Sequence, residues 1–175
     1  MLKDCRPADR KRPASQGEIL LFTMMGQAML SIQVLEECLG ASITIKVDVG
    51  HPRKISKAEA DEKLKHRLRK YTLGGAVKEA SKNKLYSEDI HSALGAFLKE
   101  RNWFTHRIVD DVYTPAKWDA LFVRIKSIAN EAHRIQRAIE DDLISYSEAN
   151  GLDMSNVRAT IRQWEWESKS GQMHS

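Results

Sequence analysis

The residues best suited to do chemistry are Arg101, Asn102 and His106, which form the pattern Arg-Asn-x-x-x-His inside a predicted helix. An arginine can hold a phosphate with two hydrogen bonds, an imidazole can move a proton near neutral pH, and an amide can orient either group. Given the arginine, asparagine and histidine content of the chain, chance would produce this pattern roughly 0.01 times. We therefore take these three residues as the candidate catalytic set, and RNA cleavage as the chemistry that they indicate.

Structural explanations for Arg101 and His106 remain open at this point. Arg101 falls within an apolar stripe of the predicted helix, where a guanidinium needs an acid, backbone carbonyls or an incoming anion. A structural ion pair with an acid of the following helix is one alternative, and an ordinary core or interface histidine is another. The two residues are about 140° apart around an ideal helix, so they converge on one phosphate only if the helix is distorted or two copies share the site.

Other chemistries have less support in the sequence. The histidines show neither HxxxH nor HExxH spacing, and Gly74-Gly75 lacks the Lys-Ser/Thr continuation of a phosphate-binding loop. Trp103 and Phe104 are expected to pack in the core and not to stack on bases. We therefore expect no metal and no cofactor, and we disfavour a metal-dependent enzyme.

The chain carries a net charge of +4, and the basic residues are unevenly distributed. Residues 1–13 sum to +3 and residues 51–70 to +5, while the remainder sums to −4. Basic clusters favour a polyanionic partner, although a solvated tail and a solvated helix face explain them equally well. The candidate nucleic-acid-binding residues are Arg53, Lys54, Lys63, Lys65, Arg67 and Arg69.

Cysteine usage and hydropathy bear on the compartment. Cys5 and Cys38 show no metal-ligand or redox-motif spacing, so we expect no disulfide and a reducing, cytoplasmic location. Residues 19–35 are uncharged, but Thr23, Gln27 and Ser31 form a polar stripe along them. We therefore interpret this segment as a core or dimer helix and not as a membrane span, which needs about 20 apolar residues.

Helical periodicity and capping signals predict an all-α chain in one domain, residues 16–167, between a flexible basic tail (1–15) and a flexible C-terminal tail (168–175). The predicted helices are 14–39, 56–82 with an interruption at 72–75, 87–113 and 115–149, followed by an amphipathic piece at 155–167. Residues 41–50 are rich in β-branched residues and could form a short strand, but a single strand has no partner to pair with, so we expect an extended loop there. Short connections then imply an antiparallel up-and-down bundle.

The stretch from Glu100 to His106, in the third helix of such a chain, resembles the Arg-polar-x-x-x-His signature of the HEPN superfamily of ribonucleases. Thr72-Leu73-Gly74 also resembles a group of uncharacterised bacterial helical proteins with the same two landmarks. The resemblance implies a homodimer whose 87–113 helices face each other, and metal-independent endonucleolytic cleavage of RNA. It also implies that Arg101 holds the scissile phosphate, His106 is the general acid or base for attack by the 2′-OH, and Asn102 positions one of them.

Members of that superfamily often act as toxins or phage-defence effectors, some with an antitoxin protein partner, and others have no catalytic role. The resemblance thus leaves a second function class open, a non-catalytic helical binding or regulatory module that engages protein or nucleic acid through its basic segments. The two classes differ in which substitutions abolish activity: Arg101 and His106 for the nuclease, the basic residues for the binding module.

Overall fold

The computed structural model describes residues 13–50 and 55–171, and every regular element in these ranges is helical. The predicted all-α class is therefore confirmed. The elements are α1 (Gln16–Ile43), the π-helix η2 (Thr44–Val49), α2 (Lys57–Lys70), α3 (Leu73–Lys82), α4 (Glu88–His106), α5 (Ile108–Val112), the 3-10 turn η3 (Pro115–Lys117), α6 (Trp118–Ala149) and α7 (Ser155–Gly171). Most of the expected basic tail (1–12), Arg53, Lys54 and residues 172–175 lie outside the described residues.

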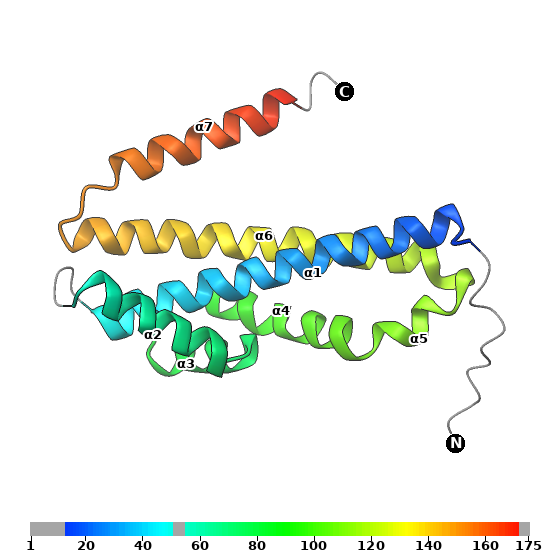
Figure 1. Ribbon diagram of the computed structural model, residues 1–175, viewed down its shortest axis with the longest axis horizontal. Coiled ribbons are helices and arrows are strands. Elements are labelled where there is room, and N and C mark those ends of the chain that lie inside the picture. Colours follow the sequence, from blue (N-terminus) through cyan, green and yellow to red (C-terminus); the bar gives the residue numbers. More distant parts are fainter. Residues whose placement is uncertain (1–12, 51–54, 172–175) are drawn as a thin grey trace.

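The two longest helices, α1 and α6, lie side by side and run in the same direction (Figure 1). Their register is fixed at two points. A Cβ atom on Gly17 would lie 2.9 Å from the Trp118 ring, and Ser31 Oγ is 3.4 Å from His133 Nε2. Because the apolar residues of α6 recur every three or four positions, the helix presents one continuous apolar face to α1. Its buried members are Leu121, Ile125, Ile128, Ala132, Ile135 and Ile139.

Helix α4 crosses the lower side of this pair in the opposite direction (Figure 1). At its beginning, the buried Tyr86 donates a hydrogen bond of 2.8 Å to Ser42 at the end of α1. Nearer its end, Glu100 forms a salt bridge with Arg124 near the start of α6. The apolar side chains Leu94, Phe97 and Phe104 are buried in the core between these helices. The position of the candidate motif is therefore set by packing between α4 and α6.

The expected extended loop at 41–50 is wrong, because α1 continues past Gly40 and becomes the π-helix η2. Thr44 satisfies the carbonyl of Gly40 through its hydroxyl at 2.9 Å, and Arg67 from α2 reaches both Thr44 and Asp48. Tertiary contacts of this kind override the β-branched propensity of the segment. The helix ends at Gly50, whose φ of +66° suits a residue without a side chain.

The second predicted helix divides in two where its sequence indicated. Ser56 and Glu59 form a reciprocal capping box at the start of α2, which ends at Lys70. Thr72 then caps α3 by accepting a hydrogen bond from the backbone N–H of Gly75. Helix α3 thus begins at Leu73, three residues earlier than the predicted helical piece.

The third predicted helix does not reach Tyr113. Helix α4 ends at His106, Arg107 takes φ −125° and ψ −16°, and the short helix α5 begins at Ile108. The motif therefore lies at the C-terminal end of a helix and not in its middle. The fourth helix ends at Asn150 and Gly151 as predicted, with Gly151 at φ +81°.

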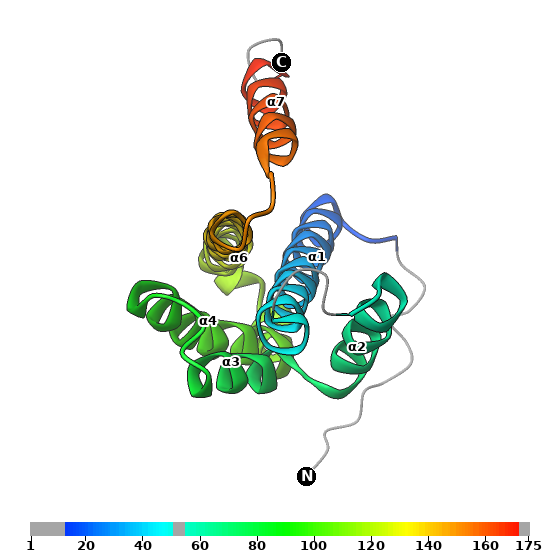
Figure 2. The same ribbon diagram turned by 90° about the vertical axis from the view of Figure 1, so that its left-hand side faces the viewer.

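Helix α7 is longer than predicted, because it continues to Gly171 and includes part of the expected flexible tail. It extends back along α6 but stands away from the other helices (Figures 1 and 2). Its base is attached through Arg158, which forms two hydrogen bonds with Glu148 of α6. An amphipathic helix held in this way leaves an apolar surface to be accounted for.

Candidate functional site

Arg101 is partly buried at the edge of the α4 core face, as its place in the apolar stripe predicted. It forms no salt bridge with any carboxylate of the described residues, so the alternative of a structural ion pair with α6 is wrong. The acid that does contact α6 is its neighbour Glu100, through Arg124. Within the described part of the chain, Arg101 Nε is buried without a hydrogen-bond partner. The guanidinium charge is therefore not neutralised by a carboxylate of the described residues.

Asn102 redirects this guanidinium. Its Oδ1 accepts a long hydrogen bond of 3.5 Å from Nη1 of Arg101. Asn102 and His106 lie one turn apart on the same helix face, and both are exposed. The arginine side chain thus bridges part of the 140° that separates its Cα from that of His106. Asn102 and His106 lie on one exposed surface, and the side chain of Arg101 reaches this surface at Asn102.

His106 is the last residue of α4, directly before the helix break at Arg107. It is exposed, so its interpretation as a core histidine is wrong. Its imidazole projects from a helix end, where the backbone is held by a 2.8 Å hydrogen bond from Arg107 N to the carbonyl oxygen of Trp103. A substrate can therefore reach it without any rearrangement of the core.

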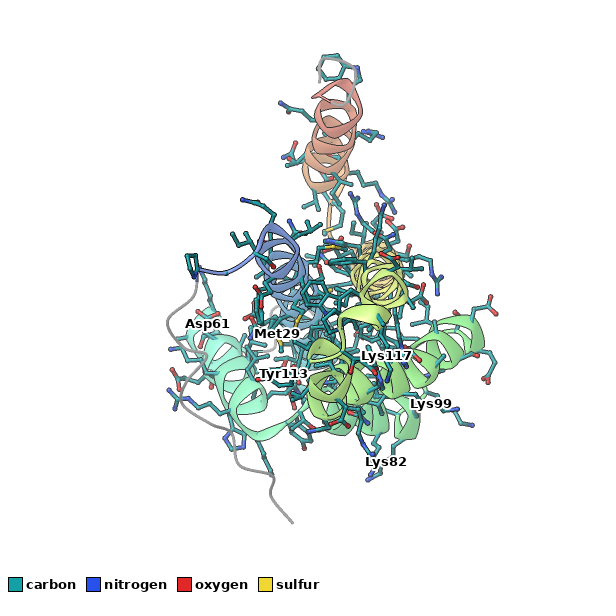
Figure 3. The ribbon with its side chains drawn as sticks, turned by 90° about the vertical axis from the view of Figure 1, so that its right-hand side faces the viewer. Met29, Asp61, Lys82, Lys99, Tyr113 and Lys117 are labelled. Carbon is teal, nitrogen blue, oxygen red and sulfur yellow. The ribbon has the colours of Figure 1, made fainter. Side chains whose placement is uncertain are left out.

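The exposed face of α4 on either side of Asn102 carries short side chains and one lysine. Its exposed members are Ser92, Gly95, Ala96, Lys99, Asn102 and His106. Lys99 points away from α4 on the side of the molecule where Lys82 of α3 also projects (Figure 3). The motif scan did not select Lys99, yet its spacing of three and seven residues from Asn102 and His106 could have placed it on this face.

Two aromatic residues in the motif support the site from behind. Phe104 is buried and Trp103 packs against the core, as expected for packing residues. The guanidinium of Arg124 lies 3.4 Å from the centre of the Trp103 ring while it also binds Glu100. This stacked ion pair fixes the turn that carries Arg101 and Asn102 against α6.

Arg67 cannot serve as a nucleic-acid ligand in this fold, and this part of the sequence prediction is wrong. Its side chain is buried and donates to Thr44 Oγ1 at 3.0 Å, to Asp48 at 2.6 Å and to Glu79 at 2.5 Å. Although burial opposes its charge, these hydrogen bonds and the two carboxylates raise the pKa of Arg67. The residue is a structural connector of α2, η2 and α3.

The remaining basic residues of α2 are exposed: Lys63, Lys65 and Arg69. Lys65 forms a surface salt bridge of 2.8 Å with Glu62. Helix α2 packs on η2 and the end of α1, whereas α4 lies beyond α3 (Figure 2). The basic α2 surface and the motif are therefore separate regions of the molecule. Arg53 and Lys54 lie outside the described residues, so the structure does not place them.

Other buried polar groups have structural roles. Lys46 of η2 is buried against Tyr86, donates to the carbonyl oxygen of Leu85 and forms an ion pair with Asp142 of α6. Burial raises the pKa of the Cys38 thiol to about 12, with a smaller contribution from Glu140. Among the described residues, no three histidine, cysteine, aspartate or glutamate side chains cluster as metal ligands would.

Comparisons with known proteins do not place this chain in a family. No family model, no curated protein and no solved structure matches it. The functional argument therefore depends on the site itself.

Proposed function

We propose that this protein is a metal-independent endoribonuclease whose catalytic residues are Arg101, Asn102 and His106. The observation that carries the proposal is the state of Arg101. Its guanidinium has no carboxylate partner in the described chain, and it is turned by Asn102 toward the face of the exposed His106. A positive charge and a proton-transfer group on one accessible surface are what cleavage of a phosphodiester requires.

The proposed reaction uses the ribose 2′-OH as nucleophile. His106 accepts the 2′-OH proton as the oxygen attacks phosphorus, the bond from phosphorus to the 5′-oxygen breaks, and that oxygen takes up a proton. The products are a 2′,3′-cyclic phosphate and a free 5′-OH. Arg101 stabilises the negative charge that develops on the phosphoryl oxygens, and Asn102 fixes the orientation of Arg101.

Two proton transfers on opposite sides of phosphorus call for two imidazoles, and one copy supplies only one at this surface. We therefore propose that two copies pair through α4, in a HEPN-like antiparallel bundle, so that both His106 side chains flank one RNA strand. This arrangement requires the two-fold axis to lie between Arg101 and His106, because in an antiparallel pair an axis further along α4 would separate the two histidines by about 3 Å for each residue of displacement. Isologous pairing also places each Arg101 near the partner's His106.

The decisive experiment is incubation of the purified chain with structured and unstructured RNA in EDTA. Wild type should leave 2′,3′-cyclic phosphate ends, and Arg101→Ala and His106→Ala should lose this activity with unchanged circular dichroism. Matched controls are Arg134→Ala on α6 and His66→Ala on α2, which remove the same types of side chain at exposed positions elsewhere. Intact RNA across varied substrates, or equal cleavage by His106→Ala, would refute the proposal.

Mixing wild type with His106→Ala tests whether the site is shared. If one RNA strand needs the His106 side chains of both copies, a mixed dimer is inactive, and an equal mixture retains about a quarter of the activity of the same amount of wild type. If each copy acts alone, the mixture retains about half. This outcome separates the shared-site geometry from the nuclease assignment itself.

A second candidate function, a non-catalytic binding module, draws on the exposed Lys63, Lys65 and Arg69 of α2. Charge reversal at these residues should then abolish RNA or protein binding, while His106→Ala should leave it unchanged.

The nuclease proposal extends to a toxin or phage-defence role with an antitoxin-like partner. Expression in the cytoplasm should then arrest growth, and His106→Ala should relieve the arrest.

A further inference from the structure

The N-terminal half of α1 presents apolar side chains that no other described helix covers. Five of them are between 37% and 62% exposed: Ile19, Leu20, Phe22, Met29 and Leu30. By length and composition, Gln16–Val49 is long and apolar enough to cross a membrane, yet only 28% of its most apolar window is buried. A core helix of a soluble monomer would bury more of this surface. Something other than the described helices of this copy therefore covers α1.

A cleft continues this surface beneath α7. It has a volume of about 860 Å³ and lies between the far end of α1, the last turns of α6 and the first turns of α7. Its apolar walls include Val34, Leu143, Ile144, Val157 and Ile161. Helix α7 stands off from α6 (Figure 2), and the cleft is lined by residues of α1, η2, α6 and α7.

We infer that a second copy of this chain covers the surface, with the two α1 helices crossing antiparallel at Gly26 and each α7 lying over the partner's first helical turns. This α1 crossing is distinct from the proposed pairing through α4, which lies on the other side of the α1–α6 pair (Figures 1 and 2). It does not depend on RNA cleavage.

Gly26 identifies the crossing point. It is exposed in the middle of the apolar face, and a Cβ atom built on it meets nothing within 4 Å. In an antiparallel pair with its two-fold axis at this residue, Phe22 of each copy packs against Leu30 of the other, four residues to either side. A glycine at the axis lets two helices approach closely where longer side chains would hold them apart.

The same register explains the cleft beneath α7. A residue seven or eight positions before Gly26 in one copy lies opposite one seven or eight positions after it in the other. The partner's Ile19 therefore lies opposite Gln33, one residue before Val34 at the mouth of the cleft. Residues 19–35 carry no charge, so no like charges meet across the crossing. Each α7 then covers the partner's chain and not its own.

The exposed area is large enough for a stable pair. The five α1 side chains, with Leu152 and Val157 at the base of α7, are 37% to 62% exposed. If the full surface of each side chain is roughly 150–200 Å², the exposed parts of these seven side chains amount to about 600 Å² in one copy. The pair then buries about 1,200 Å², the lower limit for a specific interface. The cleft walls add to this area.

A lipid surface is the competing occupant, and the polar residues of α1 argue against it. Thr23, Gln27, Gln33 and Glu37 are exposed on the same helix and would have to enter the bilayer core with the apolar residues. A homotypic helix crossing accommodates such residues at its rim, where water reaches them.

Disulfide trapping tests the crossing directly. In a Cys5→Ser, Cys38→Ser background, Gly26→Cys places two thiols on the two-fold axis, within reach of a disulfide. Mild oxidation at micromolar concentration should give a covalent dimer roughly a hundred times faster than Val123→Cys, because paired thiols meet at millimolar effective concentration. Val123 is 72% exposed on α6 and is the matched control. Equal rates for the two variants would overturn the inference.

A second measurement guards against cysteine artefacts. Phe22→Glu with Leu30→Glu places charges on exposed positions, so the fold should survive while light scattering shows loss of the α1-mediated dimer. Asn102→Cys in the same background lies close to the two-fold axis that the shared site requires and reports the α4 pairing separately, so either interface can fail without the other. A wild-type particle with the 20.0 kDa mass of one chain excludes the α1 crossing. Binding to phosphatidylcholine/phosphatidylglycerol vesicles that Leu30→Glu removes would also exclude it, in favour of lipid.

Discussion

Nη1 of Arg101 lies 3.5 Å from Oδ1 of Asn102, and this contact turns the guanidinium from the core edge of α4 toward the face of His106. The hydrogen bond to Asn102 therefore directs the guanidinium of Arg101 toward the face of His106, which the geometry of an ideal helix alone would not do. On an ideal helix, Arg101 and His106 point about 140° apart. The long arginine side chain, held at its charged end by Asn102, reduces that separation.

Replacement of Arg101 should separate function from stability. Arg101→Ala removes a charge without a carboxylate partner in the described chain and a buried Nε without an acceptor. We expect RNA cleavage to be lost, while the free energy of unfolding stays unchanged or rises by about 1 kcal/mol, since an unpaired buried donor is itself a cost. Urea unfolding followed by circular dichroism measures this. A loss of stability above about 2 kcal/mol would assign Arg101 a structural role instead.

Replacement of His106 should affect the rate and not the fold. The residue is exposed at the last position of α4, so His106→Ala removes no core contact. If His106 transfers a proton, single-turnover cleavage should slow by about 10²–10⁴ with unchanged affinity for RNA. His106→Gln serves as control, because it keeps a polar side chain of similar size but cannot act as an acid or base. Equal rates for His106→Gln and wild type would remove the histidine from the mechanism.

Much of the helical order could be predicted from the sequence because caps and periodicity are local. Helix α2 begins at the capping box of Ser56 and Glu59, and α6 ends at Asn150 and Gly151, as the sequence indicated. The π-helix at 44–49 could not be predicted in this way, because Arg67 and Lys46 hold it through contacts with α2, α3 and α6. The break of α4 at Arg107 has no glycine or proline signal, and Ile108 continues the apolar spacing across it.

The candidate site was predictable in its residue types and not in its surroundings. The spacing of Asn102 and His106 sufficed to place them on one face, and the apolar stripe sufficed to place Arg101 at its edge. Residue spacing did not predict the burial of Arg67, because a basic residue in a basic helix is expected to be solvated. Its partners Asp48 and Glu79 become known only from the structure. Charge composition does not show which cation is buried.

Arg67 therefore gives a contrasting prediction. Arg67→Ala leaves Asp48 and Glu79 without their shared cation, and breaking a buried ion pair by removal of one partner costs about 3–5 kcal/mol. We expect a large fall in the urea midpoint, with loss of helicity first in α2 and η2, seen by hydrogen exchange. Lys63→Ala, on the exposed side of the same helix, should change stability by less than about 0.5 kcal/mol. Similar effects of the two substitutions would contradict the buried role of Arg67.

Cys38 gives a prediction for alkaline pH. Burial raises the pKa of its thiol from 9.0 in the unfolded chain to about 12, so the folded protein holds the proton more tightly. The stability that this contributes is present below pH 9 and is lost as the pH rises from 9 toward 12. In a Cys5→Ser variant at pH 8, alkylation by iodoacetamide should be slower than in urea by on the order of a hundred- to a thousandfold, because only the thiolate reacts. Cys38→Ser should flatten the alkaline limb of the stability curve between pH 9 and 12. Rapid alkylation of the native protein would show that the packing of α1 against Gln136 and Glu140 opens far more readily than the structure indicates.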